Sequence, residues 1–405
     1  MLRAKLVMTL LVGGLILQNI TDASAAEKRP KLLDLGAKKC IPCKLMAPIL
    51  DALEKEYKGK LDVEFIDVWE RKNKKKAKEY GIRVIPTQVF LSAEGKELWR
   101  HEGFISKDGI LEKWAELGVE LREKKGFQRG EPARKDIRPK DQICYMCDGD
   151  INAKTKVTVH TKKGDVNICS PHHLFVMLSC LQKDVEDTEK LAKATDWATG
   201  KQIPATKAVY LYGAEQETGR PTVKAFAEHK SAKKERATGG GSIIGYDVLK
   251  KQELSHRCGF CDRSVYPQDA ALVKVGPGLH TRGCCAHCAL GVAARMGTDI
   301  EVHQPDGLTG EMIVIKTMNG FVASLEPETA VAWFGMRKKP GDKWGSAGCF
   351  HQGNFANEKN LRKWAEMNPL ETGKQITIDR ALMSKMAMSP EKIQKACKIG
   401  ECSPR

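Results

Sequence analysis

The chain has 405 residues, of which 41% are hydrophobic, so it is long enough for several domains and too apolar to be disordered throughout. Its formal net charge of +16 would suit nucleic acid or an acidic membrane face, but the lysines are spread over all regions of the chain. We therefore interpret the charge as a solvated basic surface and expect no nucleic-acid partner.

The N-terminus has the features of an export signal. Arg3 and Lys5 precede an apolar run over 6–17, and small residues at 23–25 offer a cleavage site. Residues 1–25 are therefore predicted to be a cleaved signal peptide, which gives a periplasmic or otherwise exported protein. If the segment stayed uncleaved it would anchor the protein, and only then do we expect a membrane partner. Export also argues against nucleic acid.

The next region, 26–119, alternates predicted strands and helices. Strands are expected over 31–35, 61–68, 88–91 and 98–101, and helices after residue 40 and over 72–80 and 107–117. This alternation predicts a compact α/β domain.

A Cys-x-x-Cys motif, Cys40-Ile-Pro-Cys43, begins the first of these helices. The helix dipole and the free amides stabilise a thiolate at that end, so Cys40 is the expected nucleophile. Cys43, one turn inside, is the expected resolving thiol. The alternative is an inert disulfide in a degenerate domain.

This motif, the segment "GIRVIPT" and the strand–turn–strand that follows it resemble the thioredoxin family. The resemblance implies a cis peptide bond before Pro86, beside the dithiol, and it implies that Asp34 is a buried carboxylate that relays a proton. Lys39 stands where the family usually has tryptophan, and Ile41-Pro42 replaces Gly-Pro. The surrounding lysines should make the pair more oxidising than a general reductant.

After a Lys-, Arg-, Pro- and Gly-rich segment over 120–142, which is expected to be a linker or an ordered connector, the chain carries two sets of paired metal-ligand motifs. The candidate ligands are Cys144, Cys147, Cys169 and His172 in the first set and Cys258, Cys261, Cys285 and Cys288 in the second. The first cysteines of the two sets are 114 residues apart (258−144). Two DxxTG segments recur 110 apart (306−196), and two Phe-containing segments recur 124 apart (350−226). We therefore expect an internal duplication, with repeats over 143–252 and 253–395 and a tail over 396–405.

The first repeat resembles the accessory, copper-chaperone family of nitrous-oxide reductase. The resemblance rests on Cys144-x-Met-Cys147, "DWATGKQIPATKAVYLYG", "AFAEHKSA" and "GGGSIIGYDVL". Asp148-Gly149 replaces the Gly-Met that follows the second cysteine in that family.

The second repeat resembles the organomercurial lyase family in "GCFHQGNFANEKNLRKWAEMNP". The resemblance implies that Cys285 and Cys349 occupy the positions of its two mercury-handling thiols. Cys288 stands where that family has its catalytic aspartate, so a proton donor for a carbon leaving group is missing and lyase activity is not expected.

In each repeat a cysteine knuckle, a hairpin-length excursion and a helix N-terminus follow one another. This order suggests a treble-clef-like arrangement. The expected fold class is therefore an α/β thioredoxin-like domain followed by two α+β treble-clef-like repeats.

Three interpretations of the cysteine sets remain open. Zinc would make them structural sites with four ligands each. Copper(I) or another soft ion would make them transport sites, with Met146, His173, Cys284 and Cys349 as spare soft donors. In an oxidising compartment, disulfides within each Cys-x-x-Cys are the third interpretation.

The sequence as a whole predicts an exported thiol–disulfide exchange protein coupled to soft-metal binding, as a redox-assisted metallochaperone or metalloenzyme-maturation factor. Its N-terminal domain would be a thiol–disulfide oxidoreductase. The expected partner is a client metalloprotein or another thiol–disulfide protein. The alternatives are a zinc-stabilised scaffold that binds a client and carries a disulfide reductase or isomerase, and, third, an organomercurial lyase.

Overall fold

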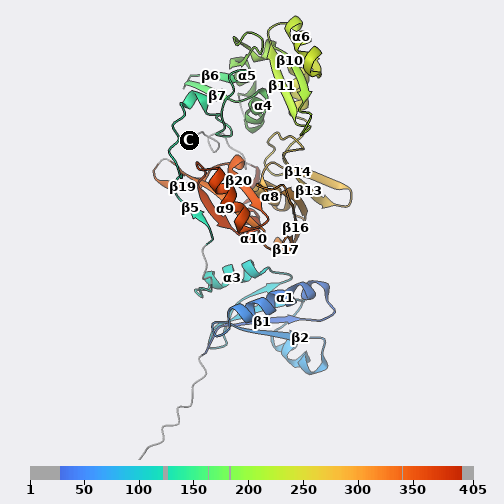
Figure 1. Ribbon diagram of the computed structural model, residues 1–405. Coiled ribbons are helices and arrows are strands. Elements are labelled where there is room, and N and C mark those ends of the chain that lie inside the picture. The colour runs from blue at the N-terminus through green and yellow to red at the C-terminus, as the bar shows by residue number, and fades with distance from the viewer. Residues whose placement is uncertain (1–27, 122–125, 163, 182–183, 340, 395–405) are drawn as a thin grey trace, which may run out of the picture.

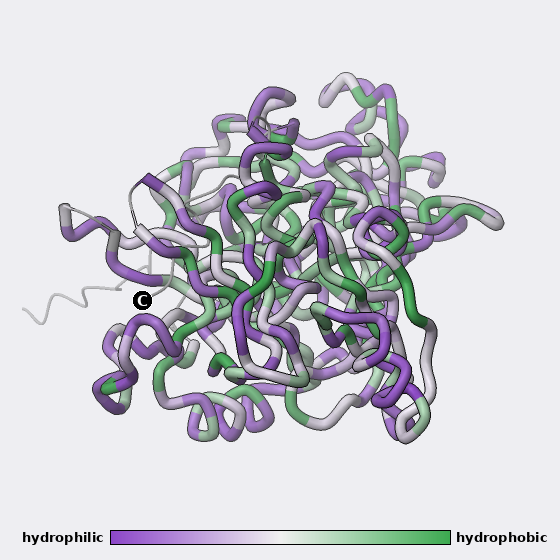
Figure 2. The backbone as a smooth tube through the Cα atoms, turned by 90° about the horizontal axis from the view of Figure 1, so that it is seen from above, coloured by the Kyte–Doolittle hydropathy of each residue, from purple (hydrophilic) through white to green (hydrophobic). Residues whose placement is uncertain are grey.

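The computed structural model describes residues 28–121, 126–162, 164–181, 184–339 and 341–394. The predicted signal peptide and C-terminal tail lie outside these ranges. Three parts follow one another from bottom to top in Figure 1: the N-terminal domain, the C-terminal region and the middle of the chain. Figure 2 shows the more hydrophobic stretches of chain inside the molecule and hydrophilic loops at its rim. None of the helices in the described ranges is long and apolar enough to cross a membrane.

The N-terminal domain is a four-stranded sheet of order β2-β1-β3-β4, in which β1 is parallel to β2 and antiparallel to β3. Its elements are β1 (Lys31–Gly36), α1 (Ile41–Glu56), β2 (Asp62–Asp67), α2 (Lys74–Glu79), β3 (Thr87–Leu91), β4 (Glu97–Glu102) and α3 (Lys107–Glu116). Apolar residues at helical spacing on α1, including Met46, Leu50 and Leu53, pack with Trp114 of α3 in one core. The predicted alternation of strands and helices is thus confirmed.

The middle region contains two sheets. The first has the order β7-β6-β8-β9 and the second the order β11-β10-β12. The strands are β6 (Val157–Thr161), β7 (Gly164–Ile168), β8 (Ala192–Thr195), β9 (Gln202–Pro204), β10 (Val209–Ala214), β11 (Pro221–Phe226) and β12 (Ser242–Ile244). The helices are α4 (Pro171–Cys180), α5 (Val185–Leu191), α6 (His229–Gly239) and α7 (Tyr246–Glu253).

The C-terminal region also contains two sheets. One has the order β14-β13-β15-β16-β17, and in the other β18 pairs with β19, β20 and β21. The strands are β13 (Ala271–Gly276), β14 (Leu279–Gly283), β15 (Glu301–Pro305), β16 (Met312–Met318), β17 (Phe321–Glu326), β18 (Val331–Lys339), β19 (Lys343–Ser346), β20 (Gln352–Phe355) and β21 (Gly373–Ile376). The helices are α8 (Ala286–Met296), α9 (Glu358–Met367), α10 (Ile378–Met386) and α11 (Pro390–Gln394).

The two regions connect their strands in a similar way. In each, a hairpin (β6–β7 or β13–β14) leads into a helix (α4 or α8), and the next strand returns beside the first strand of the hairpin. Both regions are richer in sheet than the small treble-clef-like units expected from the sequence.

Residues 126–142 are not a free linker. Short strand β5 (Gln128–Arg129) pairs with β21, and Arg129 Nη1 donates hydrogen bonds to the carbonyl oxygens of Ala365 and Asn368 at 2.7 and 3.0 Å. The connector therefore runs along the C-terminal region before it reaches the middle region, as Figure 1 shows.

The N-terminal domain is docked on the C-terminal region through α3. Ser106 Oγ donates a hydrogen bond to Asp379 at the start of α10, and the same carboxylate accepts one from the Val322 amide at 2.6 Å. Gly109 lets α3 approach closely, because a Cβ there would lie 2.6 Å from the Phe321 ring. The interface is thus built from buried side chains rather than from a tether alone.

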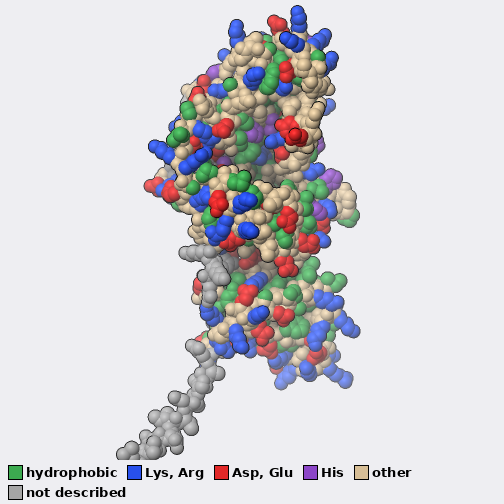
Figure 3. Space-filling view, in the orientation of Figure 1, with side chains coloured by type: hydrophobic (Ala, Val, Ile, Leu, Met, Phe, Trp, Pro, Cys, Tyr) green, Lys and Arg blue, Asp and Glu red, His purple; other side chains and the backbone are tan. Residues whose placement is uncertain are grey.

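Charged side chains are mixed on the surface. In Figure 3, lysine and arginine alternate with aspartate and glutamate on the visible face and form no single basic stripe. This distribution agrees with the interpretation of the net charge as a solvated surface.

Candidate functional sites

The dithiol of the N-terminal domain lies at the start of α1. Cys40 is the N-cap residue of this helix and is partly exposed, whereas Cys43 lies in the first turn and is buried. The nucleophilic thiol must be accessible to the disulfide of another protein, whereas the resolving thiol attacks only the mixed disulfide beside it. The difference in exposure therefore fits the expected roles of Cys40 and Cys43.

The Cys43 thiol and a buried carboxylate lie close together below the surface. Burial, and then the contact with Cys40, raise the pKa of the Cys43 thiol to about 12. Burial likewise raises the pKa of Asp34 to about 6, although Gln88 Nε2 donates a hydrogen bond to its Oδ1 at 2.6 Å. A Cβ on Gly36 would lie 3.2 Å from Cys43 Sγ and 3.4 Å from Asp34 Oδ2, so both atoms border the same point. That oxygen has no hydrogen-bond partner among the described residues.

Pro86 occupies the place that the resemblance implied. The Ile85–Pro86 peptide bond is cis, and the Ile85 carbonyl oxygen lies 4.0 Å from Cys40 Sγ. The Pro86 backbone therefore borders the dithiol.

A first group of possible metal ligands lies in the middle region. It comprises Cys144, Cys147, Cys169 and His173, whose ligand atoms all lie within 4.8 Å of one another. The Cys169 amide donates to Cys144 Sγ at 3.4 Å, and His173 Nδ1 lies 2.9 Å from Cys169 Sγ. Burial lowers the pKa of His173, but the contacts with the Cys144 and Cys169 thiols together outweigh it and raise the pKa to about 9. Three of the four expected ligands are thus together.

His172, the fourth ligand expected from the sequence, points elsewhere. Its Nδ1 lies 2.6 Å from Glu253 Oε2, and its ring stacks on Tyr266 with 3.6 Å between the ring centres. Neighbouring side chains on a helix diverge by about 100°, so only one of two successive histidines can face the cysteines. Ser170 caps α4, and His173, four residues after Cys169, is the histidine that faces the cysteines. The sequence signal for this ligand was the Cys-x-x-x-His spacing of Cys169 and His173 across the start of a helix, which the prediction did not use.

A second set of cysteines lies in the C-terminal region and forms two overlapping groups. One group contains Cys258, Cys261, Cys284 and Cys288, and the other contains Cys284, Cys285, Cys288 and Cys349, each with sulfurs within 4.8 Å of one another. The six described cysteines of this set are all free thiols. Cys258, Cys261 and Cys288 lie together as expected, but Cys285 lies in the other group, and Cys284, which had been considered only as a spare donor, takes its place.

Cys284, rather than Cys285, completes the group with the Cys258 knuckle. Its amide donates to Cys258 Sγ at 3.4 Å, as the Cys169 amide does to Cys144 in the first group. Cys285 instead caps α8, and its Sγ accepts from the Cys288 amide at 3.3 Å. Because Cys284 and Cys285 are adjacent, the sequence alone does not show which of them joins the Cys258 group. The hydrogen bond from the Cys284 amide to Cys258 Sγ identifies Cys284.

A buried arginine carries the positive charge next to this second set. Arg263 is 4% exposed, and its Nε and Nη1 have no hydrogen-bond partner among the described residues. Burial disfavours its charged form, but the negative charge of the neighbouring cysteines, Cys284 first, outweighs burial and raises its pKa. Hydrogen bonds from the neighbouring thiols also hold the pKa values of Cys258 and Cys349 well below their usual range.

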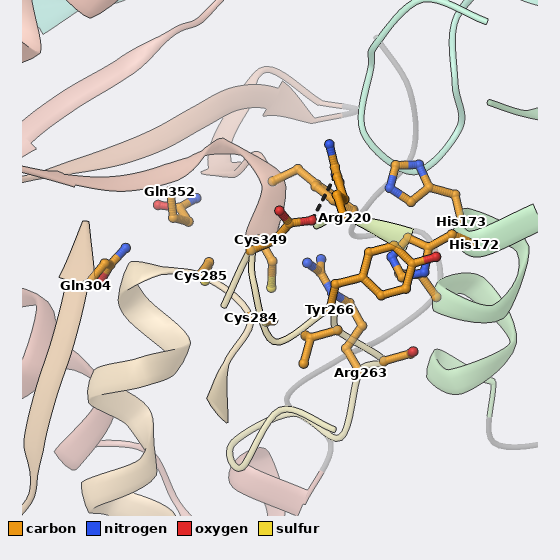
Figure 4. A pocket seen from close by; sticks show the side chains of 15 residues that line it. His172, His173, Arg220, Arg263, Tyr266, Cys284, Cys285, Gln304, Cys349 and Gln352 are labelled. Carbon is orange, nitrogen blue, oxygen red and sulfur yellow. Dashed lines mark ion pairs between the residues drawn. The ribbon is translucent and has the colours of Figure 1, made fainter. Parts of the chain in front are cut away.

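A cavity of about 260 Å³ separates the two sets of cysteines. Its walls include His172 and His173 on one side and Cys284, Cys285 and Cys349 on the other, as Figure 4 shows. Arg220 also lines the cavity and pairs with Asp269 at 2.9 Å.

The segment 349–351 joins the two sets. Cys349 belongs to the second, while the Phe350 ring contacts the His173 ring of the first, with 5.1 Å between centres. His351 Nε2 lies 3.2 Å from Asp148, the residue after Cys147. The two sets are thus parts of one packed unit. Cys40 and Cys43 belong to none of the three groups found among the described residues.

Comparisons with known proteins match two parts of the chain. The thioredoxin family model matches residues 17–116, and the alkylmercury lyase family model matches residues 272–388. The second match covers Cys284, Cys285, Cys288 and Cys349. It agrees with the resemblance to organomercurial lyases seen in the sequence.

Similar proteins are thioredoxins. That of Rickettsia felis is 36% identical over 99 residues, which are 23% of this chain and 91% of the relative. A thioredoxin of Staphylococcus aureus is 35% identical over 96 residues, which are 23% of this chain and 89% of the relative. Among solved structures, the germline-specific thioredoxin Deadhead of Drosophila melanogaster is 30% identical, with a TM-score of 0.21, over 23% of this chain and 85% of that one. Through its N-terminal domain, the chain belongs to the thioredoxin family.

Proposed function

We propose that this protein is an exported thiol–disulfide exchange protein that keeps soft-metal sites loadable, as a redox-assisted metallochaperone or a maturation factor for a metalloenzyme. The observation that carries the proposal is the combination, in one chain, of a thioredoxin-type dithiol and three groups of cysteine and histidine ligands that could hold a metal ion. A cysteine that has been oxidised to a disulfide cannot bind a metal as a thiolate, so a site of this kind in an oxidising compartment needs a reductant.

The exchange step follows from the two thiols. The Cys40 thiolate attacks one sulfur of an oxidised pair, forms a mixed disulfide and expels the other sulfur as a thiolate. The Cys43 thiolate then attacks Cys40 and expels the second sulfur. Two electrons pass to the oxidised pair, which ends as two thiols, and Cys40–Cys43 ends as a disulfide. An external dithiol protein must reduce that disulfide before the next cycle.

Asp34 is suited to take the proton of the resolving thiol. A thiol with a pKa of about 12 is almost wholly protonated at neutral pH, so Cys43 needs a base before it can attack. The carboxylate of Asp34, with a pKa of about 6, is ionised at neutral pH, and its Oδ2 is free of other hydrogen bonds within the described structure. Asp34 is therefore the proposed proton acceptor.

The donor sets fit soft ions. Three thiolates with one imidazole, or four thiolates, suit zinc, and sulfur-rich sites of low coordination number suit copper(I). Backbone amides already donate to Cys144 and Cys258, which stabilises their thiolate forms. The ion would be cargo or a structural element, and the chain's own contribution is to hold sulfur ligands reduced and buried.

An internal duplication, in which the middle and C-terminal regions are the two copies, is part of the proposal. It is supported by matched hydrogen bonds, from Cys169 to Cys144 and from Cys284 to Cys258, and by matched helix caps at Ser170 and Cys285. The relation of the first copy to the nitrous-oxide-reductase accessory family, and the treble-clef-like character of both copies, remain predictions from the sequence.

A client protein could reach the dithiol. Ile41, Trp69 and Val84 are large apolar side chains exposed in the N-terminal domain, and Ile41 directly follows Cys40. Membership of the thioredoxin family implies thiol–disulfide substrates in general. We propose a metalloprotein client or, in cis, the chain's own cysteine groups.

The test uses two variants of the full chain, isolated from the exported fraction under thiol-trapping conditions. Cys43→Ser should trap Cys40 in a mixed disulfide, and peptide mass spectrometry would identify the other cysteine. Cys40→Ser should lower the free-thiol count and metal content of the remaining cysteines, while Cys180→Ser, outside the three groups, should leave the metal content unchanged. Equal thiol counts and metal contents in wild type and Cys40→Ser would reject reduction in cis.

Organomercury cleavage is the second candidate, favoured by the alkylmercury lyase match over residues 272–388. Cys285, Cys288 and Cys349 lie in one group, so two thiols could hold mercury, but Cys288 is a poor substitute for a carboxylic acid as proton donor. Hydrocarbon release from methylmercury by the purified chain would support this candidate. Zinc that survives mild chelation, with no release to an acceptor, would favour the client-binding scaffold instead.

A further inference from the structure

The two groups of sulfurs in the C-terminal region share an edge. Cys284 and Cys288 belong to both, whereas Cys258 and Cys261 belong only to the first and Cys285 and Cys349 only to the second. Six sulfurs in two sets of four, with two in common, is the donor pattern of two metal ions bridged by a pair of thiolates.

We infer that these six cysteines form one binuclear thiolate centre, in which Cys284 and Cys288 bridge two metal ions. The inference rests on the proposed function, because it requires that the cysteines bind metal. It goes further in assigning two ions, rather than one, to the C-terminal region, and in giving each cysteine a terminal or a bridging position.

The sulfur distances suit tetrahedral coordination at both ends of the cluster. The sulfurs of a zinc tetrathiolate with bonds of about 2.3 Å lie about 3.8 Å apart. Cys261 Sγ and Cys284 Sγ are 3.5 Å apart in the first group, and Cys288 Sγ and Cys349 Sγ are 3.7 Å apart in the second. Each pair joins a terminal ligand to a bridging one. One edge of each set is therefore already spaced like the edge of a tetrahedron, and the other sulfurs of each set lie within 4.8 Å of one another.

The charge of the cluster is compatible with two ions. Metal binding displaces the thiol protons, so six thiolates with two divalent ions carry a net charge of −2. Arg263, buried and without partners for Nε and Nη1 among the described residues, supplies a positive charge beside these sulfurs. It reduces the net charge of the two-ion cluster to −1.

The middle region provides the contrast. Ser170 occupies the helix-cap position that Cys285 occupies in the C-terminal region, so the first group has no second sulfur there. Its four ligands, Cys144, Cys147, Cys169 and His173, suffice for one ion. The two regions should therefore bind one and two ions respectively.

The experiment counts metals in the full chain. The reduced protein is loaded anaerobically with zinc, freed of excess and analysed for bound metal and protein. We expect about three ions per chain, and two in the double variant Cys144→Ser/Cys147→Ser, which retains only the six-cysteine set. Loading the same protein with cadmium-113 should give two resonances coupled to each other through the bridging sulfurs. This measurement needs no variant at the cluster itself.

Variants then test the assignment. Cys285→Ser/Cys349→Ser should lose one ion and the cadmium coupling but keep the site made by Cys258, Cys261, Cys284 and Cys288. Cys258→Ser/Cys261→Ser should lose the other ion, and the control Cys180→Ser should lose none. One ion in the six-cysteine set of the wild type, or two uncoupled cadmium resonances, would overturn the binuclear centre while leaving the proposed metal-binding function intact. Absence of any bound metal would overturn both.

Discussion

The guanidinium carbon of Arg263 lies 4.1 Å from the centre of the Phe350 ring. The Phe350 ring also contacts the ring of His173 on α4. One aromatic side chain thus contacts both a ligand of the first cysteine group and the buried arginine beside the second. This arrangement shields the arginine from water and leaves the thiolates as its principal counter-charges.

Replacing Arg263 by methionine should weaken metal retention in the C-terminal region. Loss of a buried positive charge leaves the metal–thiolate cluster more negative, and we expect at least about tenfold faster zinc transfer to a chelator, or about 1.4 kcal/mol. The measurement is chelator competition on the Cys144→Ser/Cys147→Ser background. Arg220→Met is the matched control, because Arg220 lines the same cavity but is paired with Asp269. Equal rates in both variants would contradict a role for Arg263 as counter-charge.

The two neighbouring histidines should respond differently to substitution. His173→Ala removes a ligand of the first group and should lower the metal content of the full chain by about one ion. His172→Ala should keep that ion but destabilise the fold by about 1–3 kcal/mol, because the buried Glu253 carboxylate loses a hydrogen-bond partner. Metal analysis and thermal unfolding, done on both variants, separate the two effects. Loss of metal in His172→Ala alone would support the ligand expected from the sequence.

Asp34→Asn should slow disulfide reduction. Without the carboxylate the Cys43 thiol lacks a proton acceptor, so we expect the rate of reduction of a protein disulfide at pH 7 to fall about tenfold or more. In the wild type this rate should rise with pH through about 6, where Asp34 ionises, and the variant should lack this rise. Asp51→Asn, an exposed substitution on α1, is the control. A variant with the wild-type pH profile would exclude Asp34 as the base.

The same substitution should also affect stability. Asp34 is protonated more readily in the folded protein than in the unfolded chain, so the folded state binds the extra proton between pH 3.8 and about 6. Stability therefore falls as pH rises through that window and stays lower above it. Asp34→Asn removes this loss, and its unfolding midpoint in denaturant should exceed that of the wild type at pH 8 by the equivalent of about 2–3 kcal/mol. At pH 4 the two proteins should differ little.

Asp379 should make docking of the N-terminal domain pH-dependent. Burial, with Asp108 and Glu112 nearby, raises the pKa of this carboxyl to about 7, although Ser106 and the Val322 amide donate to it. The ionised form is disfavoured in the interface, so we expect the melting temperature to fall as pH rises from about 4 to about 7. In Asp379→Asn the fall should be smaller, and in the exposed control Glu328→Gln it should match the wild type. Parallel curves for wild type and Asp379→Asn would contradict this account.

The N-terminal domain was predictable from its sequence because its signals are local. Alternating strands and helices, a Cys-x-x-Cys at a helix start and the "GIRVIPT" segment specify the sheet, Cys40 and Cys43 without reference to the rest of the chain. The raised pKa of Asp34 was not visible, because it depends on burial by residues from several elements. The docking through Asp379 was also hidden, since Ser106 lies 273 residues earlier.

The sequence by itself determined that this chain carries a thioredoxin dithiol and two cysteine-rich sets, because each is marked by a Cys-x-x-Cys motif that spans only four residues. Only the tertiary structure decided which atoms meet. The turn of α4 directs His173 rather than His172 to the cysteines, one amide hydrogen bond selects Cys284, and the fold returns Cys349 to Cys288 from 61 residues away. Ligand spacing in sequence restricts which residue types can meet, whereas side-chain direction and chain folding decide whether they do.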